Sequence, residues 1–180
     1  GAMPFFVSIC NEEMENTFWE WDVDPLTRLP QIPKEDIDEI VEECDDELVL
    51  HNSRFDVEAL GTVRKQFEFW DWSRTQDTLM AGHILASNEP HDLTTMSLIY
   101  LGINVKPLED KVQEACMAAR RLARSRYKNW RIAKTGLKEM PSAKDKVWKF
   151  DMWLPRAIAE AEGYEEDHPW RTVLQEYANA

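Results

Sequence analysis

The chain has 180 residues, of which 43% are hydrophobic and eight are Trp, and its formal net charge is −13. This composition excludes an intrinsically disordered polymer, and a chain of this length buries roughly 70% of its unfolded surface, which suits one domain. No apolar run approaches the roughly 20 residues of a membrane-spanning helix and no cleavable leader is recognisable, so the sequence predicts no membrane partner and a cytoplasmic location.

The first half of the chain alternates short apolar runs with helical patterns. The first two strands are predicted to form a hairpin around an acidic turn, and the third strand follows a helix that begins after Pro33. A β–α–β connection is the simplest arrangement for the rest, so an α/β fold is expected. The predicted elements are strands at 4–10, 17–23 and 47–50 and helices at 34–44 and 54–65.

Two polar residues, Asn52 and Asp56, follow the apolar run at 48–50 with a spacing of four. If that run is a buried strand, both side chains gather at its carboxyl end, where open α/β sheets bind ligands. A carboxylate there can hold a divalent cation, and an amide can bind a nucleotide. The alternative is an Asn turn followed by an Asp on a solvated helix face.

The second half is predicted to be mostly helical. Asp77 is interpreted as the N-cap or first-turn acid of a helix over 77–86, and another helix is expected after Asp92. Residues 107–127 have the pattern of an amphipathic helix with its arginines outward. The Trp-rich segment at 130–155 fits either a lid whose rings stack on bases or an insertion anchored onto the domain.

Four short segments are distinguished by their residue order: His51-Asn52-Ser53-Arg54-Phe55-Asp56, Asp77-Thr78-Leu79, His91-Asp92-Leu93 through Tyr100-Leu101-Gly102, and Tyr177-Ala178-Asn179-Ala180. Taken in this order, they resemble motifs of the 3′→5′ exonuclease domain found in DNA polymerase I-like (family A) polymerases. They are similar to its second motif, its D-T helix, its H-x-L and Y-L-G helix, and the opening of its third motif.

The resemblance implies a ribonuclease H-like α/β fold, in which a mixed sheet is flanked by helices and carries a helical insertion. The family's first motif, D-x-E, lies on a leading strand that the residues before Pro4 do not supply, and the Asp of its third motif would be position 181. We therefore interpret residues 1–180 as a single partial exonuclease domain whose first strand is missing. Its parts are an exonuclease core at 4–103, a helical, basic and Trp-rich insertion at 104–169, and a shortened final motif helix at 170–180.

The activity implied by the resemblance is hydrolysis of phosphodiester bonds at the 3′ end of single-stranded DNA with two Mg²⁺ or Mn²⁺ ions. Asp56 would be a catalytic metal ligand, and Tyr177 would orient the attacking water. Tyr177 also fits an ordinary position on an amphipathic helix. His51, Asn52 and Phe55 would contact the terminal nucleotides, and a polymerase domain in the same parent chain is the expected partner. Because only Asp56 remains of the family's four acidic ligands, the fragment is expected to be inactive.

Positive charge is concentrated in residues 111–138, which contain nine basic residues and one acid. Such a segment can guide a phosphate backbone, although it can equally be a solvated helix face. The residues expected to contact nucleic acid here are Arg120, Arg121, Arg124 and Arg126.

Two other functions remain open from the sequence. The single carboxylate fits a noncatalytic ribonuclease H-like module that binds nucleic acid or a partner protein. An RNA-trimming nuclease of ribonuclease D type shares all of the motifs.

Overall fold

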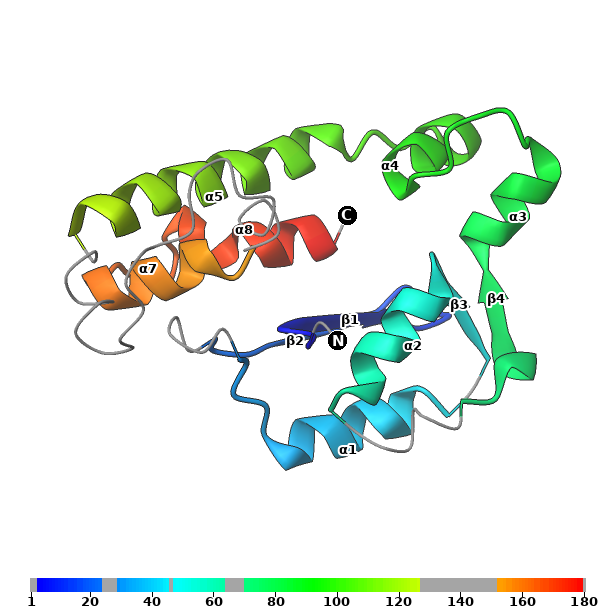
Figure 1. Ribbon diagram of the computed structural model, residues 1–180, viewed down its shortest axis with the longest axis horizontal. Helices are drawn as coiled ribbons and strands as arrows, with labels where there is room; N and C mark the ends of the chain where they lie inside the picture. The colour runs from blue at the N-terminus through cyan, green and yellow to red at the C-terminus, as the bar shows by residue number, and fades with distance from the viewer. Residues whose placement is uncertain (1–2, 24–28, 46, 64–69, 127–151, 180) are drawn as a thin grey trace.

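The computed structural model describes residues 3–23, 29–45, 47–63, 70–126 and 152–179. The side chains of Arg124 and Arg126 and the aromatic residues at 130–150 lie outside this set. The described elements form a mixed α/β structure, which confirms the expected class (Figure 1). Within this part of the chain no helix is both long enough and apolar enough to cross a membrane.

The predicted N-terminal hairpin is present, with β1 (Phe6–Cys10) antiparallel to β2 (Asn16–Glu20). Asn11 stabilises its turn because its Oδ1 accepts hydrogen bonds from the backbone N–H groups of Glu13 and Glu15, at 3.0 and 2.8 Å. The second strand ends at Glu20, earlier than predicted. Beyond it, among the described residues, the Trp21 N–H donates to the Phe5 carbonyl at 2.9 Å and Val23 forms an isolated bridge with Pro30.

A second pair of strands is parallel and shares an apolar core with the hairpin. β3 (Leu48–Leu50) pairs with β4 (Thr75–Asp77), a short polar strand that the sequence pattern did not reveal. Helix α1 (Lys34–Glu43), which confirms the predicted helix, buries Ile40 completely. Val7 from β1 and Leu48 from β3 both pack against the buried cluster of Trp21, Ile40 and Cys44, so α1 shares one apolar core with both strand pairs.

The expected mixed sheet is divided in the described structure. β1 is hydrogen-bonded to β2 and β3 to β4, and the two pairs are separate sheets. Along the chain, β3 and β4 are connected by α2 (Ser53–Gly61) and the short 3₁₀ turn η2 (Trp72–Arg74). Helix α2 ends earlier than predicted. One edge of β1 and one edge of β3 are therefore unpaired among the described residues.

From β4 the chain passes through a helical arm to a helical layer (Figure 1). The arm contains α3 (Thr78–Leu85), α4 (Leu93–Met96) and its π-helical continuation η3 (Ser97–Leu101), with Asp77 and Asp92 as the predicted N-caps. The layer contains α5 (Lys106–Arg126), α7 (Leu154–Glu162) and α8 (Pro169–Ala178). As predicted, α5 is amphipathic, and it buries Val112, Ala115, Cys116, Ala119 and Ala123.

Arg156 on α7 connects the helical layer to the hairpin. Its Nη1 lies 3.1 Å from Glu20 Oε2, and its Nη2 lies 3.4 Å from Asp22 Oδ1. Its Nε lies 3.0 Å from Oε1 of Glu160, one turn further along α7. The Glu20 side chain is only 8% exposed. Burial raises the pKa of Glu20 above its usual range, and the neighbouring guanidinium of Arg156 opposes that rise.

Replacing Arg156 with Met should destabilise the protein by about 2 kcal/mol, because it leaves the Glu20 carboxylate buried without its partner. The loss should shrink below pH 4.5, where Glu20 is protonated in the folded and unfolded states alike. Urea unfolding at several pH values measures both effects. The exposed ion pair of Arg54 and Glu58 supplies the control, since Arg54→Met removes a solvent-screened contact and should change stability far less than Arg156→Met.

Candidate functional site

The parallel strands end side by side, and their ends bring two sequence motifs together. Leu50 lies opposite Asp77 in the β3–β4 register, so His51 and Asn52 emerge next to Asp77 and Thr78. Asn52 adopts the left-handed conformation, with φ 66°, which turns the chain sharply from β3 into α2. Its side chain makes no capping hydrogen bond and is exposed. The carboxyl end of β3 therefore places His51 and Asn52 beside the end of β4.

Asp77 fastens the turn after β3 to the start of α3. Its Oδ2 accepts hydrogen bonds from the N–H and the hydroxyl of Ser53, at 2.9 and 2.7 Å. Its Oδ1 accepts from the N–H groups of Asn52 (3.2 Å), Leu79 (2.9 Å) and Met80 (3.4 Å). Desolvation raises the pKa of Asp77, but these donors outweigh it and lower that pKa to about 2. Asp77 is thus a structural carboxylate that uses both of its oxygens.

Asp56 has the opposite environment. It lies in the first turn of α2, is partly buried, and accepts none of the hydrogen bonds found among the described residues. Burial is the main cause that raises the pKa of the Asp56 carboxyl to about 6; the Asp77 carboxylate adds to this rise, and His51 opposes it. A carboxylate with a perturbed pKa and no committed partner is a candidate for ligand or proton chemistry.

His51 has its ring fixed by a hydrogen-bonded chain. Its Nδ1 lies 3.0 Å from the Thr78 hydroxyl oxygen, and that hydroxyl donates to the Leu50 carbonyl at 3.1 Å. Because the Thr78 hydroxyl has one proton, Nδ1 of His51 must carry the hydrogen of the first pair. In neutral His51, Nε2 is then the nitrogen with a free lone pair, and it is available to accept a proton or a ligand.

The residues present do not by themselves fit a two-ion metal centre. Among the described residues, no group of three or more His, Cys, Asp and Glu side chains could hold a metal ion. Asp77 is occupied by its five donors, so Asp56 is the carboxylate of this site that remains for a cation. Oxygen ligands from elsewhere would be needed to bind Mg²⁺ or Mn²⁺.

Other residues expected at the site lie in different surroundings. Phe55 is 58% exposed on α2. Tyr177 on α8 packs with Val112 and Val173, and the charged groups that act on it are Glu109 and Lys106. Burial raises the pKa of Tyr177. The structure thus packs Tyr177 against the helical layer and shows no hydrogen bond between it and Asp56 among the described residues.

The arginines expected to contact nucleic acid lie on α5, whose apolar side packs on α7 and α8. Arg121 is exposed and Arg120 is partly buried. The expected contribution of the side chains of Arg124 and Arg126 lies outside the described residues.

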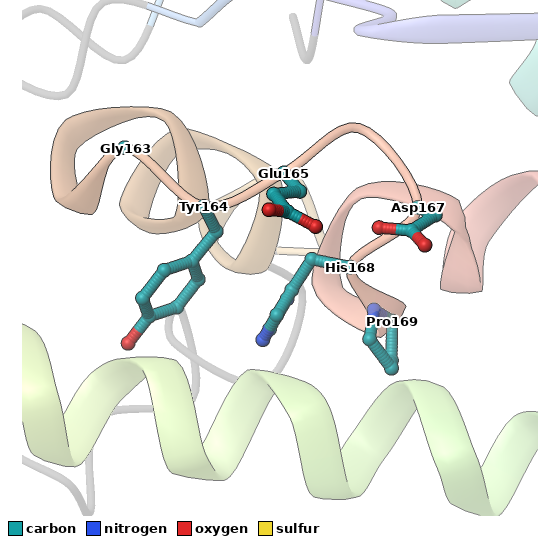
Figure 2. Close-up of a pocket in the computed structure, with 6 residues that line it drawn as sticks. All are labelled: Gly163, Tyr164, Glu165, Asp167, His168 and Pro169. Carbon is teal, nitrogen blue, oxygen red and sulfur yellow. The ribbon is translucent and has the colours of Figure 1, made fainter.

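A shallow hollow on the helical layer, at the turn between α7 and α8, is accounted for by helix capping. It is lined by Gly163, Tyr164, Glu165, Asp167, His168 and Pro169, and Figure 2 shows the Tyr164 and His168 rings side by side. Their centroids are 4.3 Å apart, and Nδ1 of His168 accepts a hydrogen bond from the Trp170 N–H at 3.1 Å, which caps α8. Nδ1 of His168 is therefore engaged in capping α8.

Sequence reasoning missed Ser53 and Thr78, which join the turn after β3 to β4. Their roles depend on β4, a strand of three residues that is too short and too polar to be predicted from the sequence.

Comparison with models of known protein families finds no match, and searches of curated proteins and of solved structures find none either.

Titration of Asp56 should have a midpoint near pH 6, about two units above the ordinary value of 3.8. His51→Gln should raise that midpoint, because the nearby imidazole lowers the pKa of Asp56. Carboxyl-carbon NMR shifts, assigned with Asp56→Asn, measure both. A midpoint near 4, unchanged by the His51 substitution, would show that Asp56 is an ordinary surface acid.

Asp77→Ala should cost about 2–3 kcal/mol of unfolding free energy, because it leaves several N–H groups without their acceptor. A matched control is Asp71→Ala, since among the described residues Asp71 accepts hydrogen bonds from the N–H and hydroxyl of Ser73 within its own turn and lies 3.9 Å from Arg74 Nε. This control should cost clearly less than Asp77→Ala, because Asp71 is exposed and its cap is local. Equal losses in thermal unfolding would mean that Asp77 is only a local cap.

Proposed function

We propose that this chain is part of a 3′→5′ exonuclease domain with a ribonuclease H-like fold, and that Asp56 supplies one carboxylate to a centre for Mg²⁺ or Mn²⁺. The observation that carries the proposal is the position and state of Asp56. It is partly buried, has a raised pKa, and lies beside the ends of two parallel strands. That edge of an α/β sheet is where ligands bind.

The divided sheet is consistent with this proposal. The hairpin and the parallel pair both contribute to the core cluster that contains Ile40 of α1, and β1 and β3 each have an edge unpaired among the described residues. A further strand hydrogen-bonded to both edges would join the pairs into one mixed sheet. Acidic residues on such a strand would lie in the same sheet as the strand end that precedes Asp56, and they would supply the oxygen ligands that the described residues lack.

The substrate that fits this proposal is the 3′ end of a single-stranded nucleic acid. The parent chain would also carry a polymerase domain. The exposed ring of Phe55 can pack on a terminal base, and the free amide of Asn52 can hydrogen-bond to it. RNA is an equally good chemical fit for these two contacts, so a ribonuclease D-like activity stays as the related alternative.

A noncatalytic binding module is a second candidate, and one observation favours it. Of the two described carboxylates at the strand ends, Asp77 is saturated by backbone and hydroxyl donors, and Asp56 accepts no hydrogen bond from the described residues. If no additional acids join the site, the fold would bind nucleic acid or a protein without hydrolysing it.

The 180-residue chain should show no measurable hydrolysis of single-stranded DNA with either Mg²⁺ or Mn²⁺, because one carboxylate holds two hydrated ions too weakly. In a longer parent chain, Asp56→Ala should reduce 3′→5′ hydrolysis by orders of magnitude. Glu58→Ala, on the same helix but exposed and paired with Arg54, should leave the rate within about threefold.

Three results would contradict the proposal. Hydrolysis by the 180-residue chain that Asp56→Ala abolishes would show that the centre is already complete. A parent enzyme that keeps its rate after Asp56→Ala would show that Asp56 is not a ligand. A parent chain without hydrolysis of DNA or RNA would favour the binding module.

A further inference from the structure

The hydroxyl of Thr78 links the start of α3 to the His51 side chain. Thr78 is the first residue of α3 and is partly buried. Its hydroxyl donates to the Leu50 carbonyl at 3.1 Å and lies 3.0 Å from Nδ1 of His51. One hydroxyl therefore bridges the end of β3 and a side chain of the candidate site, and it uses its only proton on the strand.

This bridge decides which ring nitrogen of His51 carries the proton. A histidine side chain in water prefers the proton on Nε2. Here Nδ1 is the donor, because the Thr78 hydroxyl can only accept from it. A methyl group in place of the hydroxyl would leave the Nδ1–H without an acceptor, and the ring would return to its ordinary tautomer. Thr78 thus controls the chemical state of His51 as well as the orientation of its ring.

The other ring nitrogen of His51, Nε2, is left as an acceptor. In the part of the chain that the structure describes, the bond at Nδ1 is the one hydrogen bond of this ring. Burial raises the pKa of Asp56, and His51 opposes that rise. Hydrogen bonds from Thr95 lower the pKa of Asp92, and His51 adds to this effect. The ring therefore lies near the first turn of α2 and the N-cap of α4. Both oxygens of Asp92 are already used by Thr95, at 3.0 and 2.7 Å.

The acceptors at this site favour a ligand group that donates a hydrogen. Nε2 of neutral His51 and the ionised carboxylate of Asp56 can only accept. At the end of a nucleic acid strand, the donors are the N–H groups of the base, which differ from base to base, and the 3′-hydroxyl, which every terminal nucleotide shares. A nuclease that removes one nucleotide after another must accept all four bases. The 3′-hydroxyl is therefore the donor that fits this site best.

We propose that Thr78 is a positioning residue that holds His51 with its proton on Nδ1, so that Nε2 accepts a hydrogen bond from the 3′-hydroxyl of the terminal nucleotide. The ligand in this inference rests on the proposed exonuclease function, and the inference adds the group that recognises the strand end. The 3′ oxygens inside a strand are esterified and cannot donate. Recognition of the hydroxyl therefore distinguishes a 3′ end from the interior of the strand.

The tautomer is measured by ¹⁵N NMR of the four histidine rings, in mildly alkaline buffer where histidine is ordinarily neutral. The signals of His51 are assigned with His51→Phe. The parent chain should carry the His51 proton on Nδ1. Thr78→Val should move it to Nε2, whereas Thr78→Ser, which keeps the hydroxyl, should leave it on Nδ1. Thr62→Val is the matched control, because the Thr62 hydroxyl donates to the Ala59 carbonyl, at 2.6 Å, and should leave the tautomer unchanged.

Ligand recognition is measured as equilibrium binding of the 180-residue chain to short single-stranded DNA that ends in either a 3′-hydroxyl or a 3′-deoxy sugar. The strand with the hydroxyl should bind roughly fivefold more tightly, as one hydrogen bond between neutral groups predicts. Thr78→Val and His51→Phe should remove this difference. Thr78→Ser and Thr62→Val should keep it.

A parent chain with the His51 proton on Nε2 overturns the positioning role, and so does a Thr78→Val variant whose ring keeps the proton on Nδ1. Equal affinity for the two strand ends, or binding to neither, overturns the ligand. If Thr78→Val does not fold, the tautomer of the parent chain and the binding by His51→Phe still decide both points. Neither measurement depends on hydrolysis, so the absence of exonuclease activity in a longer parent chain would contradict the proposed function and leave both results readable.

Discussion

The carboxylate of Asp77 holds together the two chain segments from which the candidate site is built. One of its oxygens binds the N–H and hydroxyl of Ser53, and the other binds the N–H groups at the start of α3 as well as that of Asn52. These contacts fix the turn after β3 relative to β4, although each strand has only three residues. Short strands provide few ladder hydrogen bonds, so the ordering of this corner depends on the side chain at the end of β4.

Two carboxylates a short distance apart acquire opposite properties from this arrangement. Hydrogen-bond donors lower the pKa of Asp77 to about 2, whereas burial raises that of Asp56 to about 6. Environments that separate the pKa values of neighbouring acids commonly separate their roles as well. Here the ionised acid maintains the turn and the less acidic one remains open to a ligand, which is why the functional proposal rests on Asp56.

The remaining parts of the molecule differ in the charge that they carry. The hairpin is tied to the helical layer by Arg156, which pairs with the buried Glu20, and by apolar contacts around Ala119 and Ile158. The arm joins the parallel strands to that layer and has almost no charge.

The sequence by itself determined the features that depend on local chemistry. Apolar spacing located α1 and α5, the acidic turn located the hairpin, and the capping residues Asp77 and Asp92 marked the starts of α3 and α4. The position of Asn52 and Asp56 after an apolar run predicted that they gather at a strand end. These signals are readable because caps, turns and helix faces are set by residues within a few positions of one another.

Only the tertiary structure decided which of these residues interact. β4 is too short and polar to recognise, and its pairing with β3 turns a helix-capping Asp77 into the anchor of a turn 24 residues earlier in the chain. The raised pKa of Asp56 depends on burial, and the packing of Tyr177 on α5 depends on how three helices associate. Burial and hydrogen bonds between distant segments arise from the packing of the whole chain, so no local pattern encodes them.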